Sequence, residues 1–353
     1  MSVCPMIGEV RREEGRLGAP RRPRSKRLES DEPPAKCLRL TETPQDSGFL
    51  PSPGSPQPSS PHPPSQGPSC IGNYLLLPPG DRDRPHRALD LHSGNQLHCK
   101  VFPLKHYQNK IESYIHLPFH PNITGIVEVV QGENDAYVFF EKDFGDMHCY
   151  VRSCKCVGEE EAAKLFRQIV SAVDHCHRHS VVLGDLKLRK FVFADKERTQ
   201  LRLESLEDAH IMKGDDDSLS DKHGCPAYVS PEILNTTGTY SGRLADAWSL
   251  GVMLYTLLVG RYPFHDSDPS SLFSKIRRGQ YCIPEHVSPK ARCLIRSLLR
   301  KEPSERLTAE EIFLHPWFEA ASHPVCTDQE TNSSDQLVPD IPQNSVDIDS
   351  FFC

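Results

Sequence analysis

Long apolar runs are missing from this sequence of 353 residues. A membrane-spanning helix needs about 18 or more consecutive apolar residues. The longest candidate, Trp248–Gly260, is shorter and is bracketed by Asp246 and Arg261. The first residues also lack the apolar core of a secretory signal peptide. We therefore expect no membrane partner and no secretion.

Cysteine pairs at CxxC spacing are also missing, although the chain has 13 cysteines. An odd number at irregular spacing is typical of reduced thiols in the cytosol or nucleus, not of a disulfide framework. His175 and His179 lie four residues apart, but no further ligand is near them in the sequence, so we predict no metal site. The net charge of −7 disfavours general binding to nucleic acid.

Both ends of the chain have the composition of non-globular sequence. Residues 1–70 contain 14 of the 31 prolines and almost no apolar run, which predicts a disordered Pro/Ser-rich region. Its basic run Arg21–Arg27 fits either a nuclear import signal or a solvated segment, and we expect a protein of the nucleus and cytoplasm. From Leu307 onward there are nine acidic residues and no Lys or Arg. Residues 319–353 are therefore predicted to form an acidic tail.

The middle of the chain, residues 71–318, contains two kinds of hydrophobic pattern. Short apolar runs between turn residues predict a small lobe of five strands and one helix. The strands are Leu75–Leu77, Ala88–Leu91, Leu97–Val101, Ile126–Val130 and Ala136–Phe140, and the helix is Tyr107–His116. After these, apolar residues recur every three or four positions, which predicts a mainly helical part. It comprises helices at Glu159–His177, Asp246–Val259, Ser270–Arg278, Pro289–Leu299 and Ala309–Phe313, and a strand pair at Phe191–Phe193 and Leu201–Leu203.

Four landmarks follow one another in the second part. They are Gly184-Asp185-Leu186-Lys187, Ser230-Pro231-Glu232, Asp246-x-Trp248-Ser249-x-Gly251 and Pro303-x-x-Arg306. Their order and spacing resemble the eukaryotic protein kinase fold. The resemblance implies an α+β bilobal protein-kinase-like fold, with a small β-rich N-lobe, a larger α-helical C-lobe and disordered ends. It also implies two structural roles, a buried ion pair between Glu232 and Arg306 and an Asp246 side chain that anchors the catalytic loop.

Most of the parts that transfer a phosphoryl group are missing. The reaction needs a glycine loop, a strand lysine, two metal-binding side chains and a base. Lys100 and Asp185 occupy the lysine and base positions, but the first hairpin offers only Gly80. Ser205 and Lys190 stand where the two magnesium ligands belong. A serine hydroxyl is a poor substitute for a carboxylate on Mg²⁺, and a lysine side chain has no oxygen. We therefore predict an inactive chain with no cofactor.

Two alternatives would give the chain an enzyme activity. A register slip would bring Glu204 or Asp208 to the metal, but it would also turn the apolar face of Leu201–Leu203 to solvent. The other is a weak metal-independent protein kinase that would use the vestigial residues Lys100, Asp185 and Lys187.

Several segments together resemble one family of kinase-like proteins. They are Leu183–Lys187, Ser205-Leu206-Glu207, Asp221–Tyr228, Asp335–Asp340 and Asp349–Cys353. These segments are similar to those of the Tribbles pseudokinases, from about residue 71 to the end of the chain. The resemblance implies a catalytically inactive adaptor that brings an E3 ubiquitin ligase to substrates for proteasomal degradation. It further implies that the chain binds MAP kinase kinases and modulates MAP kinase signalling.

The acidic tail contains a short segment suited to binding a partner. Pro339 restricts Val338 to an extended conformation, and Leu337 and Val338 are apolar anchors between acidic residues. Such a segment fits a groove with a basic rim. The resemblance implies that it binds the constitutive photomorphogenic E3 ubiquitin ligase through Asp335, Gln336, Leu337, Val338, Pro339 and Asp340. The alternative is an acidic tail that contains Val-Pro by chance.

Two segments of the kinase-like domain are further candidates for binding proteins. The resemblance implies that MAP kinase kinases bind Ile312, Leu314, His315, Pro316, Trp317 and Phe318, although the tryptophan of this segment packs on the core of ordinary kinases. We predict that a substrate is captured by Gly224, Cys225, Pro226, Ala227, Tyr228, Val229 and Ser230. The resemblance implies that these substrates are CCAAT/enhancer-binding transcription factors. The alternatives are a solvated acidic loop and a scaffold for MAP kinase kinases alone.

Apolar residues are also present at the end of the tail. Ile348, Phe351 and Phe352 would be a liability if they stayed exposed, so we predict that they dock. Our hypothesis is that they bind the kinase-like lobe of the same chain and mask Asp335–Asp340 until substrate binds. The alternative is a disordered end.

Overall fold

The structure is a computed structural model that describes residues 67–78, 85–214, 216–222, 224–235 and 238–322. Several predictions lie outside these residues. They concern residues 1–66 of the N-terminal region, Gly80, the ligase-binding segment 335–340, and the tail residues Ile348, Phe351 and Phe352.

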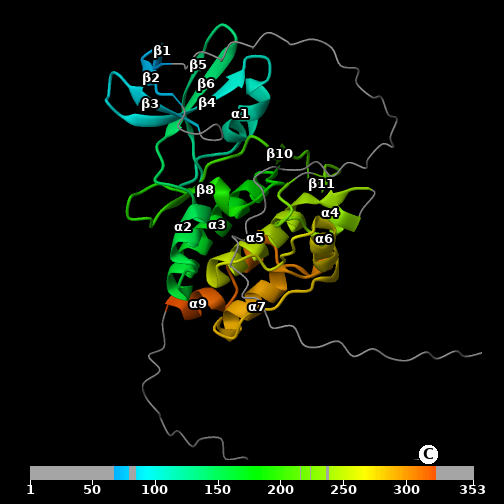
Figure 1. Cartoon of the computed structure of the whole chain (residues 1–353). Helices are drawn as coiled ribbons and strands as arrows, with labels where there is room; N and C mark the ends of the chain where they lie inside the picture. Colours follow the sequence, from blue (N-terminus) through cyan, green and yellow to red (C-terminus); the bar gives the residue numbers. More distant parts are fainter. Residues whose placement is uncertain (1–66, 79–84, 215, 223, 236–237, 323–353) are drawn as a thin grey trace, which may run out of the picture. The chain divides into compact units, whose positions relative to one another are not determined.

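Six strands form one antiparallel sheet in the first part of the described chain (Figure 1). They are β1 (Ser69–Ile71), β2 (Tyr74–Leu76), β3 (His86–Asp90), β4 (Gln96–Pro103), β5 (Ile126–Gln131) and β6 (Asp135–Glu141). Their order in the sheet is β1-β2-β3-β4-β6-β5. The prediction of five strands was wrong by one, because the three residues of β1 are too few to show an alternating pattern.

The sheet buries one face in a small apolar core. Its side chains come from Tyr74, Leu76, Ala88, Leu97, Cys99 and Phe139. Leu97 and Cys99 alternate along β4 with His98 and Lys100, so the latter two face the opposite side of the sheet. The helix α1 (Tyr107–His116) has the bounds that the sequence predicted, and it packs against β4.

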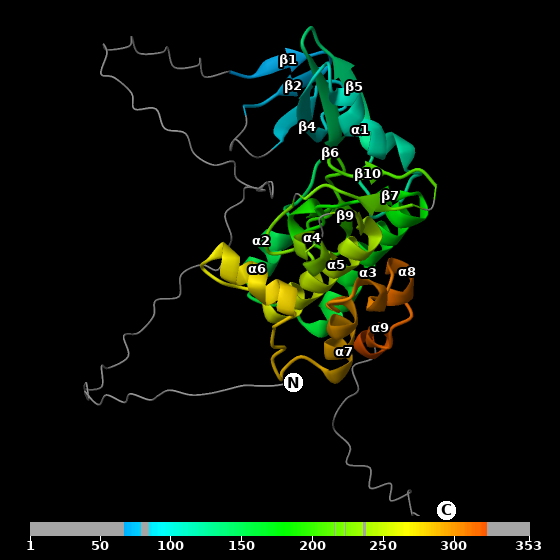
Figure 2. The same cartoon turned by 90° about the vertical axis from the view of Figure 1, so that its right-hand side faces the viewer.

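Helices make up most of the second part. They are α2 (Met147–Cys154), α3 (Glu159–Arg178), α4 (Pro231–Asn235), α5 (Gly242–Val259), α6 (Pro269–Arg278), α7 (Pro289–Leu298), α8 (Ala309–Ile312) and α9 (Trp317–Ser322), with 3₁₀ turns η1 (Leu188–Lys190) and η2 (Pro303–Glu305). Fifteen of the 18 residues of α5 are buried, as expected for a helix that is apolar on nearly every side. It packs between α3 and α7 and forms the centre of the helical part (Figure 2).

Short strand pairs position the loops of the candidate site. β8 (Phe191–Phe193) pairs with β9 (Leu201–Leu203), which confirms the predicted strand pair. β7 (Val181–Val182) pairs with β10 (His210–Ile211), and β11 (Ser218–Leu219) pairs with β12 (Tyr240–Ser241). The predicted catalytic-like loop therefore lies between β7 and β8.

The sheet with α1 and the helical part together form the predicted bilobal α+β fold. Most predicted helices agree with the structure to within a few residues, but α2 and α4 were missed because both are short. None of the helices in the described residues has the length and hydrophobicity needed to cross a membrane.

Candidate functional site

Lys100 is held by two carboxylates from the segment that follows β9. Its Nζ lies 2.6 Å from Oε1 of Glu204 and 2.7 Å from Oε1 of Glu207. Burial alone would lower the pKa of Lys100, but the two carboxylates outweigh it and raise this pKa. Burial acts to raise the pKa of Glu207, and the charge of Lys100 outweighs it and leaves this pKa lowered. Lys100 and Glu207 are therefore both charged at neutral pH.

Tyr114 from α1 completes this cluster. Its hydroxyl lies 2.7 Å from the carbonyl oxygen of Glu204 and 2.9 Å from Oε1 of Glu207. The same hydroxyl accepts a hydrogen bond from the backbone N–H of Leu206 at 3.0 Å. Burial raises the pKa of Tyr114 well above its usual value, so the hydroxyl keeps its proton. Sequence reasoning missed this residue, because its partners lie 90 or more positions away.

The residues at the two predicted metal-ligand positions interact with neighbouring side chains. The Ser205 hydroxyl donates to Oε2 of Glu207 at 2.5 Å. Lys190 is buried, and its Nζ lies 3.9 Å from Oδ2 of Asp185. The same carboxylate oxygen lies 2.5 Å from Nζ of Lys187. Asp185 is thus beside two ammonium groups, which repel a metal cation.

The two carboxylates considered as replacement metal ligands also form ion pairs. Glu204 pairs with Lys100, and Asp208 lies 3.0 Å from Nζ of Lys110. Leu201 and Leu203 are fully buried, so β9 keeps the register that its apolar alternation predicted. The register slip is therefore excluded.

Two structural interactions that the kinase resemblance implied are present. Asp246 accepts hydrogen bonds from the backbone N–H groups of Leu183 and Gly184 at 2.9 and 3.0 Å. Arg306, whose side chain is completely buried, donates to both carboxylate oxygens of Glu232 at 2.7 Å. Both predictions are confirmed. Asp246 fixes the catalytic-like loop to α5, and Arg306 fixes α4 to the rest of the helical part.

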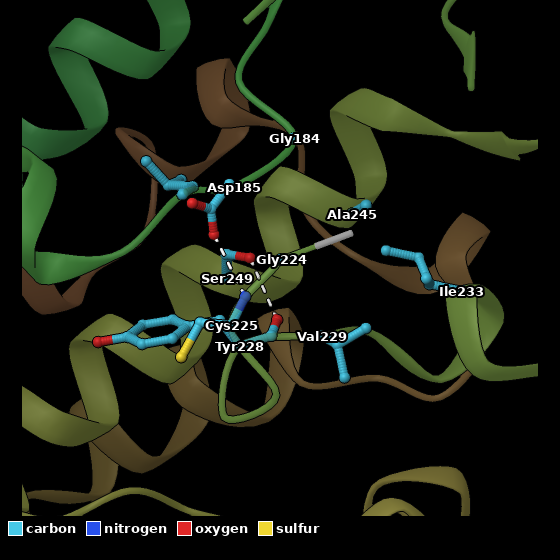
Figure 3. Close-up of a pocket in the computed structure, with 10 residues that line it drawn as sticks. Gly184, Asp185, Gly224, Cys225, Tyr228, Val229, Ile233, Ala245 and Ser249 are labelled. Atoms are coloured by element: carbon cyan, nitrogen blue, oxygen red, sulfur yellow. Dashed lines mark hydrogen bonds between the residues drawn. The ribbon is translucent and has the colours of Figure 1, made fainter. Parts of the chain in front are cut away.

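Asp185 meets the predicted substrate-binding segment at a small pocket (Figure 3). Oδ1 of Asp185 accepts a hydrogen bond from the backbone N–H of Cys225 at 3.3 Å. Ser249 on α5 donates to the backbone oxygen of Tyr228 at 3.3 Å. The cavity volume is about 10 Å³, which is close to the space of one water molecule. This pocket is too small for a substrate side chain.

The predicted substrate-binding segment is only partly accessible. Its buried members are Ala227, Tyr228, Val229 and Ser230. Gly224, Cys225 and Pro226 are half-buried. Any contact with a substrate on this segment is therefore restricted to its first three residues unless the segment moves.

A second cavity lies on the face of the sheet that carries Lys100. It has a volume of about 150 Å³, and Leu75, Leu89 and His98 are among its lining residues. Pockets for drug-sized ligands typically have about 300–1,000 Å³. Nδ1 of His98 lies 2.7 Å from Oδ2 of Asp143, which follows β6. Sequence reasoning missed His98, although its position two residues before Lys100 places it on the same face of β4.

The segment predicted to bind MAP kinase kinases is divided between core and surface. Ile312, Trp317 and Phe318 are buried, and the Trp317 indole N–H donates to Oε2 of Glu159 at 3.1 Å. Leu314 lies between them in sequence but is 81% exposed. The tryptophan thus packs on the core, and Leu314 is the large apolar side chain that remains available to a partner.

One group of side chains has the spacing of a metal site in the described part of the chain. The ligand atoms of Asp146, His148 and Cys149 lie within 4.8 Å of one another. Asp146 already accepts a hydrogen bond from the backbone N–H of Cys149 as the N-cap of α2. The positive end of the helix dipole also faces this position. We assign no metal ion to it.

Comparison with known proteins places the chain among kinase-like proteins. A family model described as protein kinase domain matches residues 90–318. Tribbles homolog 1 from Homo sapiens is 69% identical over 329 residues, which cover 90% of this chain and 88% of that protein. Tribbles homolog 2 from Canis lupus familiaris is 58% identical over 332 residues, covering 93% and 95%. Tribbles homolog 3 from Mus musculus is 51% identical over 327 residues, covering 91% and 92%.

Proposed function

The chain belongs to the Tribbles pseudokinase family, as its motifs predicted, and on this premise we propose that it is a catalytically inactive adaptor. The ion pairs that Lys100 forms with Glu204 and Glu207 are the main support for this proposal. An active kinase needs this lysine for the nucleotide and needs side chains that hold magnesium. In this chain the lysine charge is already compensated, and Glu207 adds negative charge where a triphosphate would approach.

Calorimetric titration of the full chain with ATP, with and without Mg²⁺, tests the lack of nucleotide binding. We expect no saturable heat in either condition. Lys100→Met is the control, because any residual binding that survives this change occurs outside the cleft. Saturable, magnesium-dependent binding that disappears in Lys100→Met would contradict our account and favour the alternative of a weak kinase.

We propose that the tail recruits the constitutive photomorphogenic E3 ubiquitin ligase through Asp335–Asp340. The kinase-like domain and the tail belong to one chain, so a substrate on the first and a ligase on the second are held at a high effective concentration. Val338→Ala with Pro339→Ala is expected to abolish co-precipitation of the ligase. Gln343→Ala with Asn344→Ala, just beyond the segment, is the matched control. Equal ligase capture by both double variants would refute this role.

We propose that CCAAT/enhancer-binding transcription factors are the substrates and bind beside Asp185. The partial exposure of Gly224, Cys225 and Pro226 supports this assignment, since these residues lie next to the catalytic-like loop. Pro226→Asp introduces a charge and is expected to prolong the cellular half-life of the transcription factor, while the ligase is still captured. If Pro226→Asp prolonged the half-life but also abolished ligase capture, the result would indicate unfolding of the protein instead.

We propose that MAP kinase kinases bind at Leu314, and the 81% exposure of this apolar side chain supports the proposal. Leu314→Glu is expected to abolish MAP kinase kinase capture without lowering the melting temperature. Leu91→Glu is the matched control, because Leu91 is also exposed but lies in the β-rich lobe. A MAP kinase kinase that still binds Leu314→Glu would show that this segment has only a packing role.

We also propose that Ile348, Phe351 and Phe352 bind the kinase-like lobe of the same chain and mask the ligase-binding segment. A separate proposal is that the protein is present in the nucleus and cytoplasm. Replacing these three residues with Ser is expected to raise the affinity for the ligase in the full-length chain. Unchanged affinity would exclude masking. Replacing the arginines of Arg21–Arg27 with Ala is expected to reduce the nuclear fraction, as measured by fluorescence microscopy.

A further inference from the structure

Basic residues are concentrated in one stretch of the helical part. Residues 275–301 contain eight Lys or Arg and one Asp or Glu, in a chain with a net charge of −7. The remainder of the chain has 33 basic and 47 acidic residues. A strongly basic stretch in an otherwise acidic protein produces a local positive potential, which attracts acidic partners.

Part of this stretch lines a groove at the C-terminal ends of α6 and α7 and the segments that follow these two helices. The groove has a volume of about 660 Å³. Its cationic side chains are Arg278, Arg296, Arg300 and Lys301, and its apolar ones include Tyr281 and Leu299. Gly279 adopts a left-handed conformation with φ of 64°, which turns the chain from the end of α6 into the segment that carries Tyr281. The groove thus combines an apolar surface with a cationic rim.

The cations of the rim are exposed, and no carboxylate in the described part of the chain forms an ion pair with any of the four. Lys275, earlier in the same stretch, differs because Oδ2 of Asp266 lies 3.0 Å from its Nζ. Glu305 is the acidic residue among those that line the groove. The groove therefore has a surplus of positive charge that the described fold leaves uncompensated.

A purely structural role explains only some of these cations. Positive side chains at helix C-termini interact favourably with the helix dipole, and this applies to Arg278 on α6 and Arg296 on α7. Arg300 and Lys301 lie beyond the last residue of α7. Their backbone carbonyl oxygens accept hydrogen bonds from Arg306 at 2.9 and 3.2 Å, which fixes the backbone while both residues remain exposed.

We propose that this groove is a docking site for an acidic peptide segment of a partner protein. Carboxylates of the peptide would pair with Arg296, Arg300 and Lys301, and an apolar residue would contact Tyr281 and Leu299. The concave shape favours a peptide, because a membrane surface or a nucleic-acid duplex presents a broad face that cannot enter a groove of this size. This surface is separate from the segments at 224–230 and 312–318, so the proposal does not depend on their roles.

Fluorescence anisotropy with the full chain tests the proposal. The probe is a labelled 12-residue peptide of Asp and Glu with a central Leu-Phe pair, and its control has Asn and Gln in place of the acids. We expect saturable binding of the acidic probe alone, weakening as the salt concentration rises. The double variant Arg296→Glu with Arg300→Glu is expected to lower the affinity by about tenfold or more.

Matched variants separate docking from general charge attraction. Lys196→Glu with Lys213→Glu reverses two exposed cations elsewhere and is expected to change the affinity by less than about twofold. Arg300→Ala with Lys301→Ala is a milder change, expected to weaken binding even if the charge reversal unfolds the protein. Equal losses in the control and groove variants would overturn the proposal. So would tighter binding of a 12-nucleotide RNA, or displacement of the probe by a peptide of residues 327–349, which would make the chain's own tail the occupant.

Discussion

Lys100→Met is predicted to destabilise the protein, although the corresponding lysine serves catalysis in active kinases. The change leaves Glu204 and Glu207 without the ammonium group that lies 2.6 and 2.7 Å from them. At an effective dielectric constant of about 20, each such contact has a Coulomb energy of about 6 kcal/mol before desolvation. Desolvation offsets much of this energy, and breaking a buried ion pair typically costs about 3–5 kcal/mol. We expect a loss near the lower figure, because the three side chains keep 12 to 17% exposure.

Denaturant and thermal unfolding of the full chain measure this loss. About 3 kcal/mol corresponds to a fall in melting temperature of about 6–12 °C for a domain of this size. Lys110→Met is the matched control, because Lys110 pairs with Asp208 at 3.0 Å but both side chains are more than 40% exposed. Such a surface pair contributes about 0–1 kcal/mol. Similar losses for the two variants would refute the importance of burial.

A double-mutant cycle isolates the contact between the two charges. Glu207→Gln added to Lys100→Met removes one of the two uncompensated carboxylates, so the double variant is expected to be more stable than Lys100→Met alone. The pKa of Glu207 is lowered in the folded protein, so its contribution is present above the ordinary carboxyl pKa and is lost as pH falls. The difference between wild type and Lys100→Met should therefore narrow in acid. A constant difference down to low pH, or a double variant no more stable than the single one, would show that the cluster does not act electrostatically.

Three further predictions concern the scaffold. Glu232→Gln leaves the buried Arg306 without its charge partner. We expect it to lower the free energy of unfolding by about 3 kcal/mol or more, measured by denaturant unfolding against the wild type. Gly260→Ala would place a methyl group 1.5 Å from a backbone oxygen at a φ of 77°, so we expect loss of soluble folded protein on expression. Burial lowers the pKa of both His120 and His175, whose rings lie 4.6 Å apart. The unfolded chain therefore binds these protons more readily, and the free energy of unfolding should fall as pH drops below about 6.5. Replacing both with Gln should flatten this dependence, and an unchanged slope would contradict the assignment.

Much of the architecture was predictable because its signals are local. The helices α1, α3 and α7 show apolar residues at three- and four-residue spacing, and their predicted bounds agree with the structure to within one residue. The pair β8–β9 was predicted from two short apolar runs. The missed elements, such as β1, β10, β11, β12, α2 and α4, are short, so too few positions were available to show a period.

The sequence predicts which catalytic parts the candidate site lacks, but it does not predict the contacts of the site. That Ser205 and Lys190 stand at metal-ligand positions follows from counting along the chain from landmarks. That Glu207 contacts both Lys100 and Tyr114 does not follow from counting, because it is separated from them by 107 and 93 positions. The same holds for Arg306 and Glu232, whose pairing required the resemblance to a known fold.

The sequence alone predicted the order of most strands and helices along the chain, and it identified the family. Tertiary structure decided which side chains are accessible. It buries Tyr228, Ser230 and Trp317, and it leaves Leu314 at the surface although Ile312 and Trp317 on either side of it are buried. It also gathers Arg278, Arg296 and Arg300 around one groove. The physical reason is that periodicity and motif spacing depend on neighbours in the chain, whereas burial and charge compensation depend on contacts between segments that only folding brings together.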